Sequence, residues 1–215
     1  MHFKCFIFDL DGTLVDSVAD LTNAFNFMRR KLNFPEVTRE TMAQLIGNGM
    51  HDVIRQSFKL ANLEVSEEEV NSALKIMLDY YMDHTTDNCR AYDGVVPTLE
   101  TLKKSGCKLT VVTNKFTAAT LNILQALQLE QYFDCIFGNG DGFQLKPAPD
   151  LLLEAARKTN TPIADCVMVG DNHTDLGAAR RAGMRSVFVT YGYGATGNET
   201  PDIVIDKFDD LKVLI

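Results

Sequence analysis

The sequence predicts an α/β fold: a doubly wound, mainly parallel (Rossmann-like) sheet with an all-helical module inserted after its first strand. Two observations predict it. Short, nearly continuous apolar runs alternate with helical patterns, as in a parallel sheet that helices cover on both faces. One long segment, in contrast, carries helical patterns alone. We therefore expect residues 1–14 and 90–215 to form the core and residues 15–89 to form the inserted module.

Six apolar runs are the candidate strands of the core. They comprise residues 5–8, 108–113, 135–137, 166–169, 187–189 and 203–205. Apart from Lys108 they are almost entirely apolar, which is typical of strands buried on both faces. Helical patterns separate or follow them at residues 96–104, 117–127, 148–158, 174–182 and 209–214. Strand and helix in turn predict the doubly wound sheet.

The inserted module shows helical periodicity and no convincing strand. Its first helix has an apolar face with spacings of three and four, made by Val18, Leu21, Phe25, Met28 and Leu32. A capping box, Ser66 with Glu69, begins a second helix with another such face: Val70, Ala73, Leu74, Met77 and Tyr81. A module at this point can fold over the carboxyl end of the first strand, where open α/β sheets bind ligands. The pattern leaves open that these helices form a further layer of one domain.

Composition narrows the class of partner. The 215 residues include 21 basic and 29 acidic ones, a formal charge of −8, with no basic run longer than a pair. This balance argues against nucleic acid and against an anionic membrane surface, and favours a small molecule. No apolar run approaches the roughly 18 residues that span a bilayer. Five scattered cysteines without a C-x-x-C pair suggest reduced thiols, no zinc site and a cytoplasmic location.

Two acidic groups follow two of the predicted strands. Asp9 and Asp11 stand where the first strand ends, and Gly12 permits a tight turn after them. Asp171 and Asp175 follow the apolar run at 166–169, one helical turn apart. Carboxylates brought together in this way need a cation or a shared proton. An oxygen-rich cluster that also leaves room for phosphate and water favours Mg²⁺.

Polar residues at two further positions suit a phosphate. Thr113, Asn114 and Lys115 end the second predicted strand with a hydroxyl, an amide and an ammonium group. Lys146 comes shortly before a predicted helix and can offset the charge that aspartate and phosphate share.

Taken together, these four segments resemble the motifs of the haloacid dehalogenase superfamily, in its phosphatase branch. Asp9-x-Asp11-Gly12-Thr13 is similar to the first motif of that family, and Thr113-Asn114 to the second. Lys146 corresponds to the third motif, and the segment from Gly170-Asp171 to Asp175 to the fourth. The resemblance covers the whole chain and implies that residues 15–89 are a cap domain that closes over the core.

The same resemblance implies a role for each motif residue. Asp9 is expected to be the nucleophile that forms an aspartyl-phosphate, and Asp11 the general acid and base. Mg²⁺ would be held by the Asp9 carboxylate, the Asp11 backbone carbonyl and the Asp171 carboxylate, with Asp175 behind these ligands. Thr113, Asn114 and Lys146 would bind the transferring phosphoryl group. The acid at Asp11 favours phosphoester cleavage over carbon–halogen or phosphonate chemistry.

The expected substrate is a small phosphorylated metabolite, and local features resemble phosphoglycolate phosphatases within the family. The specificity candidates are Gly47, Asn48, Gly49, Arg55 and Lys115. A helix that begins after Gly47-Asn48-Gly49 could direct backbone N–H groups at a second anion such as a carboxylate, although a plain helix-to-helix turn remains open. The alternatives are a phosphatase for pyrophosphate, a sugar phosphate or a nucleotide, a phospho-acceptor signalling domain, or a non-catalytic binding module. We expect a monomer or a homodimer.

Overall fold

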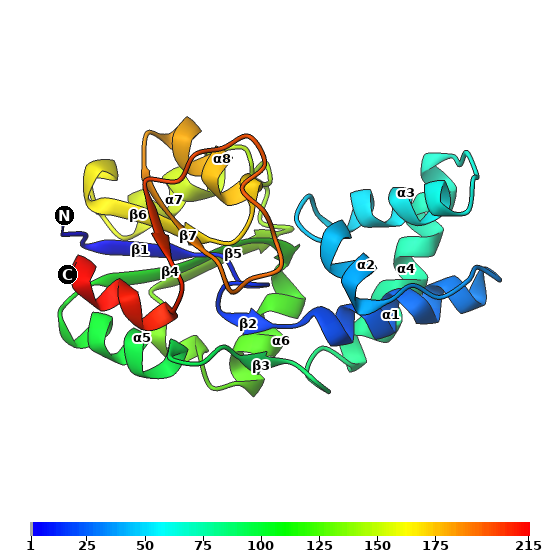
Figure 1. Cartoon of the computed structure of the whole chain (residues 1–215), viewed down its shortest axis with the longest axis horizontal. Helices are drawn as coiled ribbons and strands as arrows, with labels where there is room; N and C mark the ends of the chain where they lie inside the picture. Colours follow the sequence, from blue (N-terminus) through cyan, green and yellow to red (C-terminus); the bar gives the residue numbers. More distant parts are fainter. Residues whose placement is uncertain (1) are drawn as a thin grey trace.

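A six-stranded parallel sheet, together with the helices that cover its faces, forms the larger part of the molecule (Figure 1). The computed structural model describes residues 2–215. The strands are β1 (Cys5–Phe8), β4 (Lys108–Phe116), β5 (Cys135–Asn139), β6 (Cys166–Gly170), β7 (Arg185–Val189) and β8 (Ile203–Ile205). Their order is β5-β4-β1-β6-β7-β8, and every neighbouring pair is parallel. The predicted fold class and all six predicted strands are confirmed.

The two faces of the sheet are built by alternation along each strand. In β1, Phe6 and Phe8 belong to one apolar cluster, whereas Cys5 and Ile7 belong to another. Helices α5 (Val95–Lys104) and α6 (Thr117–Ala126) and the 3₁₀ turn η3 (Phe208–Leu214) supply apolar side chains to the first cluster. Helices α7 (Asp150–Lys158) and α8 (His173–Ala182) supply the second. A strand covered on both faces has no polar side, which explains the continuous apolar runs in the sequence.

Four helices between β1 and β4 form a separate body, which we call the helical insert. They are α1 (Val18–Lys31), α2 (Arg39–Leu45), α3 (Met50–Leu60) and α4 (Glu67–Asp83). Both predicted apolar faces, on α1 and on α4, lie in one buried cluster of the insert. The predicted capping box also forms, because the Ser66 hydroxyl accepts from the Glu69 N–H and the Glu69 carboxylate accepts from the Ser66 N–H.

A short antiparallel ribbon joins the insert to the core. Strand β2 (Val15–Asp16) pairs with β3 (Arg90–Ala91), so the chain enters and leaves the insert side by side (Figure 1). The expectation of no strand in residues 15–89 is therefore wrong at β2. Two residues are too few to show an alternating pattern, and the pairing comes from a partner about 75 positions away. Nearby, Asp20 of α1 accepts hydrogen bonds from the backbone N–H groups of Asn88 and Cys89.

Two other elements differ from the sequence expectation. Residues 208–214 form the 3₁₀ turn η3 rather than an α-helix, and α7 begins at Asp150, after Pro149, rather than at 148. Short 3₁₀ turns also precede β5, as η1 (Glu130–Tyr132), and β6, as η2 (Ile163–Asp165). None of the helices in residues 2–215 combines the length and apolar character required to cross a bilayer.

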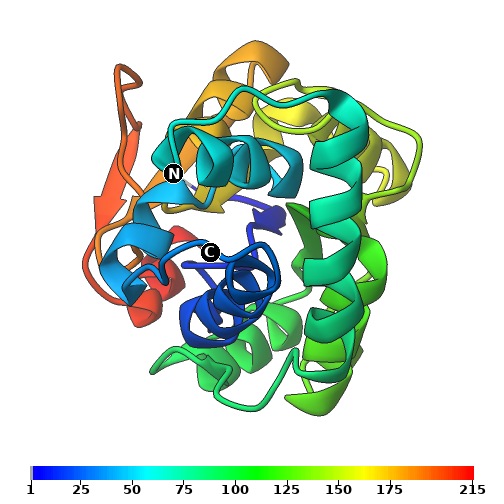
Figure 2. The ribbon, with the colours of Figure 1, turned by 90° about the vertical axis from the view of Figure 1, so that its right-hand side faces the viewer.

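The chain order of the strands fixes where a ligand can bind. From β1 the chain adds β4 and β5 on one side and then returns to add β6, β7 and β8 on the other. The carboxyl end of β1 is therefore the switch point of the sheet, where helices diverge and leave a crevice. β1 runs from the end of the molecule that carries both termini toward the insert (Figure 1). Seen from the opposite end, α1–α4 lie in front of the core (Figure 2).

Candidate active site

Asp9 is the first residue beyond β1 and is held in place by the sheet. Its N–H donates to the Val169 carbonyl at 2.9 Å, which continues the ladder between β1 and β6. Its Oδ1 accepts from the Leu10 N–H at 2.7 Å. The chain then turns at Gly12, whose φ is +85°. A Cβ there would lie 2.2 Å from Oδ2 of Asp171, so only glycine lets the backbone pass this carboxylate.

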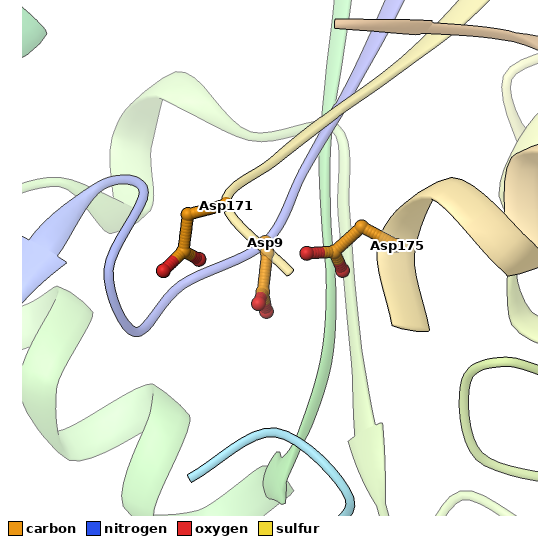
Figure 3. Close-up of side chains that lie close together, drawn as sticks. All are labelled: Asp9, Asp171 and Asp175. Atoms are coloured by element: carbon orange, nitrogen blue, oxygen red, sulfur yellow. The ribbon is translucent and has the colours of Figure 1, made fainter. Parts of the chain in front are cut away.

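Three carboxylates converge at the switch point. Asp9 follows β1, Asp171 follows β6 and Asp175 lies in the first turn of α8; each has an oxygen within 4.8 Å of the other two (Figure 3). Asp175 is fully buried and Asp171 nearly so. Burial, together with the charges of Asp175 and Asp9, raises the pKa of Asp171 to about 8. The cluster therefore favours a bound cation.

Lys146 lies beneath the cluster. Its ammonium group is 2.9 Å from Oδ1 of Asp9 and 2.6 Å from Oδ1 of Asp175, and it also donates to the Val112 carbonyl. Burial alone would lower the pKa of Lys146, but the charges of Asp175 and Asp9 raise it. Lys146 is therefore a fixed cation beside Asp9 and Asp175.

The donor set fits a hard divalent cation. Asp171 has its Oδ2 turned to the backbone N–H groups of Tyr193 and Gly194, at 3.1 and 2.8 Å, and its Oδ1 3.3 Å from the Thr13 hydroxyl. Both oxygens of Asp175 are taken, by Lys146 and by the Asn172 N–H. Among residues 2–215, none donates a hydrogen bond to Oδ2 of Asp9. Oδ1 of Asp171 has only the long contact with Thr13, whereas Asp175 has the 2.6 Å contact with Lys146. Asp9 and Asp171 could therefore bind a metal directly, while Asp175 orients its neighbours.

Asp11 faces the same space and has its own cation. Lys115 donates to both of its carboxylate oxygens, at 3.0 and 2.8 Å, and the Ser17 hydroxyl also donates to Oδ1. Lys115 is buried; burial by itself would lower the pKa of Lys115, but the Asp11 charge raises it. The ammonium group therefore balances and aims the Asp11 carboxylate.

A small cavity lies between the core and the helical insert. It is lined from the core by Asp9, Asp11, Thr113, Asn114, Lys115, Asp171, Asn172 and Tyr193, and from the insert by Ile46, Gly47, Gly49 and Met50. Its volume is about 30 Å³. The insert contacts the core here, because the Asn114 amide donates to the Gly47 carbonyl at 2.9 Å.

The structure brings together most of the residues singled out in the sequence. Lys146 and Asp175 lie behind the wall, in contact with Asp9 or with each other. Gly47, Gly49 and Lys115 line the cavity. Two specificity candidates do not line the cavity. The Asn48 amide nitrogen lies 3.4 Å from Oδ2 of Asp52, and Nη2 of Arg55 donates to Oε1 of Glu67 at 2.7 Å on the exposed side of α3.

Several residues of the site were not predicted. Met50 and Tyr193 line the cavity, Ser17 contacts Asp11, and Tyr81 lies against Lys115. Tyr81 occupies a position of the apolar face of α4 and was assigned to the core of the insert, as its burial also suggests. Only the tertiary contact with Lys115 distinguishes it.

Comparison with known proteins gives this arrangement a family. The family model described as haloacid dehalogenase-like hydrolase matches residues 6–189, which include all four motif segments. The chain belongs to the haloacid dehalogenase-like hydrolase family. The resemblance seen in the sequence is thereby confirmed.

Relatives in this family are similar over almost the whole chain. Phosphoglycolate phosphatase 1 of Pseudomonas aeruginosa is 36% identical, over 95% of this chain and 77% of its own. Phosphoglycolate phosphatase of Agrobacterium fabrum is 34% identical, over 94% of this chain and 88% of its own. The crystal structure of a predicted phosphoglycolate phosphatase from Haemophilus somnus superimposes with a TM-score of 0.91 at 32% identity, covering 98% and 97% of the two chains. The chain is thus a phosphatase of the haloacid dehalogenase-like family.

Proposed function

We propose that this phosphatase hydrolyses phosphate monoesters through an aspartyl-phosphate on Asp9, with Mg²⁺ as cofactor and 2-phosphoglycolate as its preferred substrate. The observation that carries the proposal is the convergence of Asp9, Asp11, Thr113 and Asn114 on one cavity, with Asp171 beside Asp9. A nucleophile, an acid and base, and phosphate donors are the groups that phosphoryl transfer requires.

The reaction would proceed in two displacements at phosphorus. In the first, which Asp11 must begin in its protonated form, an oxygen of Asp9 forms a bond to phosphorus, the bond to the alcohol oxygen breaks, and Asp11 gives its proton to that oxygen. In the second, Asp11 takes a proton from water, the water oxygen bonds to phosphorus, and the bond to Asp9 breaks. Glycolate and inorganic phosphate are the products.

The phosphoryl oxygens would be held by the core. The Thr113 hydroxyl and the Asn114 amide stand at the cavity wall, and Lys146 offsets the charge on Asp9. Mg²⁺ bound by Asp9, the Asp11 carbonyl and Asp171 would supply charge neutralisation at the phosphoryl group.

The helical insert would act as the cap that selects the substrate. A cavity of about 30 Å³ has room for two or so water molecules, so the insert must move to admit any phosphate ester. Once closed, a tight space lined by Gly47, Gly49, Met50 and Lys115 favours a two-carbon acid over a sugar or a nucleotide. The names of the relatives support the same substrate. We assign residues 1–14 and 90–215 to the core and 15–89 to the cap.

The first test is phosphate release with and without Mg²⁺. The substrates are 2-phosphoglycolate, pyrophosphate, glucose 6-phosphate, a nucleoside monophosphate and p-nitrophenyl phosphate, and Asp9→Asn is the control. We expect Mg²⁺-dependent release that is fastest from 2-phosphoglycolate and absent in the control. Release only from the other compounds would overturn the substrate, and release by Asp9→Asn at the wild-type rate would overturn the mechanism.

A second variant separates the two half-reactions. Asp11→Asn cannot give or take the proton, so both formation and hydrolysis of the phosphoenzyme should slow by about 100-fold or more. Rapid quench with a radiolabelled phosphate ester measures both steps. Wild-type rates in this variant would exclude Asp11 from proton transfer.

A further inference from the structure

Tyr81, near the end of helix α4 in the insert, is buried without a polar partner. Its side chain is 2% exposed, and its hydroxyl makes no hydrogen bond with the residues that the structure describes. Burial raises the pKa of this phenol, so the group is neutral. A buried hydroxyl without a partner is unfavourable, whereas phenylalanine or leucine would fill an apolar core without that penalty.

The ring of Tyr81 lies against the ammonium group of Lys115. The ammonium nitrogen of Lys115 lies 4.9 Å from the ring centroid, within the range of a cation–π interaction. The same nitrogen is 2.8 and 3.0 Å from the two oxygens of Asp11. Lys115 is 7% exposed, so little water competes for it. The Tyr81 ring therefore contacts the Lys115 ammonium group, which in turn contacts the Asp11 carboxylate, so that a buried chain of contacts connects the insert to the active site.

We propose that Tyr81 is a positioning residue for Asp11, acting through Lys115; the inference rests on the proposed function, in which Asp11 transfers protons. A lysine side chain has four rotatable bonds, and the aromatic ring restricts where its ammonium group can lie. Held there, the ammonium group aims the Asp11 carboxylate. Proton transfer requires hydrogen-bond reach, and misplacement by about 1 Å lowers a rate by about 100-fold.

The contact between Tyr81 and Lys115 connects the insert with the core. Tyr81 belongs to the insert, whereas Lys115 on β4 and Asp11 after β1 belong to the core. Tyr81 is not among the residues that line the cavity, whereas Lys115 is, so we expect Tyr81 to act on a substrate only through Lys115. Its effect should therefore fall on turnover and leave substrate affinity unchanged.

The test is a double-mutant cycle between Tyr81 and Lys115, with steady-state kinetics on the best substrate of the panel above. Tyr81→Leu should lower kcat about tenfold while KM stays within about twofold, since a desolvated cation–π contact is lost. Tyr81→Phe retains the ring and should restore kcat to within about twofold of wild type. Lys115→Met should lower kcat about 100-fold. The double variant Tyr81→Leu/Lys115→Met should be no slower than Lys115→Met alone.

Two controls separate positioning from packing. Tyr80→Leu changes the neighbouring tyrosine of the same helix, which stacks on Phe27 and His84, and should leave kcat unchanged. If Tyr81→Leu unfolds below the assay temperature, Tyr81→Met, which fills the space with an apolar chain, takes its place.

Four results would overturn the inference: effects of Tyr81 and Lys115 that multiply in the double variant, a loss in Tyr81→Phe as large as in Tyr81→Leu, a rise in KM in place of the fall in kcat, or wild-type kcat in Tyr81→Leu. In each case the wild-type enzyme is active and the proposed function stands. A wild-type enzyme without Mg²⁺-dependent activity on any compound of the panel would instead remove the proposed function.

Discussion

Individual charges at the switch point do not balance within the protein. Four carboxylates, on Asp9, Asp11, Asp171 and Asp175, share the site with two ammonium groups, on Lys115 and Lys146. If all are ionised the sum is −2, in surroundings where most of these groups are buried. One divalent cation would offset that charge. The two carboxylate charges that no lysine balances therefore favour a bound metal ion.

Gly12 is the residue on which this acidic cluster depends most directly. Replacing it by alanine introduces a Cβ 2.2 Å from Asp171, in a backbone conformation at φ +85° that alanine resists. We expect Gly12→Ala to lower kcat/KM by at least about 100-fold, because Asp171 must move.

Gly183 provides the matched control, since its φ is +69° and an added Cβ would meet nothing within 4 Å. Gly183→Ala should reduce the free energy of unfolding by about 1 kcal/mol and leave kcat/KM within about twofold of wild type. Steady-state kinetics and urea unfolding of both variants are the measurements. Equal losses of activity would show that backbone strain, rather than the clash with Asp171, is responsible.

At this scale the sequence predicted the motif residues and missed those that support them. Asp9, Asp11, Asp171 and Lys146 could be recognised because each follows an apolar run or precedes a helix start in an order that a family shares. Tyr81 could not, because a tyrosine on an apolar helix face has the same local signal whether or not it meets Lys115. Arg55 illustrates the opposite case, since its charge suggested an anion and its actual partner is Glu67.

Among the elements, the start of β5 is held beside β4 by the carboxylate of Asp134 in addition to the backbone pairing of the two strands. Asp134 accepts from the Leu109 N–H at 2.9 Å and lies within 3.3 Å of the ammonium groups of Lys103 and Lys108. Partial burial alone would raise the pKa of Asp134, but these donors hold it below its usual range. Its contribution to stability is therefore present above the pKa of the unfolded chain, about 4, and is lost as the pH falls through the lower pKa of the folded state.

Asp134→Asn should consequently destabilise the protein in a pH-dependent way. We expect the free energy of unfolding to fall by about 1 kcal/mol at about pH 7, with the difference from wild type shrinking toward pH 3 or so. Urea unfolding across that range is the measurement. Asp79→Asn removes an exposed carboxylate paired with Lys75 and should change the free energy by less than about 0.5 kcal/mol. A difference for Asp134→Asn that grows on acidification would contradict the prediction.

The loop between α2 and α3 sets how closely the insert approaches the core. The Gly47 carbonyl accepts from Asn114, and a Cβ on Gly47 would lie 2.8 Å from the amide of Asn172. Gly47→Ala should therefore hold the loop away from the core and raise KM about tenfold. Gly140→Ala, in a loop where an added Cβ meets nothing within 4 Å, should not. An unchanged KM in Gly47→Ala would show that this approach is not needed for binding.

Elements with their own local pattern were predictable, and those without one were not. The six strands of the sheet carry their own apolar signal, and the capping box of α4 is local in sequence. The ribbon of β2 and β3 depends on a pairing between distant residues. In η3 the buried residues Phe208, Leu211 and Leu214 are three apart, a spacing that suits a 3₁₀ turn as well as an α-helix. Local patterns thus define the elements that pack along a whole face, and tertiary contacts define the rest.

In the molecule as a whole, the site lies between the core and the helical insert, which Figure 1 shows side by side. Two apolar clusters lie on the two faces of the core sheet, and a third lies mainly in the insert but includes Ala119 of α6 from the core. The chain passes between the bodies only at the β2–β3 ribbon. Two bodies on a narrow connection can move relative to each other by a hinge at that connection. Because the cavity of about 30 Å³ is smaller than a phosphate ester, we expect such a motion when a substrate enters.

A disulfide between the insert and the core would test this motion. Gly49 belongs to the insert and Leu145 to the core, and a Cβ on Gly49 would lie 3.5 Å from Cδ1 of Leu145. Gly49→Cys/Leu145→Cys therefore places two thiols close together, and we expect oxidation to join them once the loop brings the two Cβ atoms within about 4.5 Å. Four of the five native cysteines are buried and protected from exchange.

With the insert held against the core, we expect turnover to fall at least about tenfold and to return on reduction, since substrate entry and product release both need the open form. Mass spectrometry confirms the bond, and each single variant under the same oxidant is the control. A locked enzyme that retains full turnover would mean that the substrate reaches Asp9 by another route. In that case the contact between Asn114 and Gly47 would be a permanent part of the active site rather than the closed state of a cap.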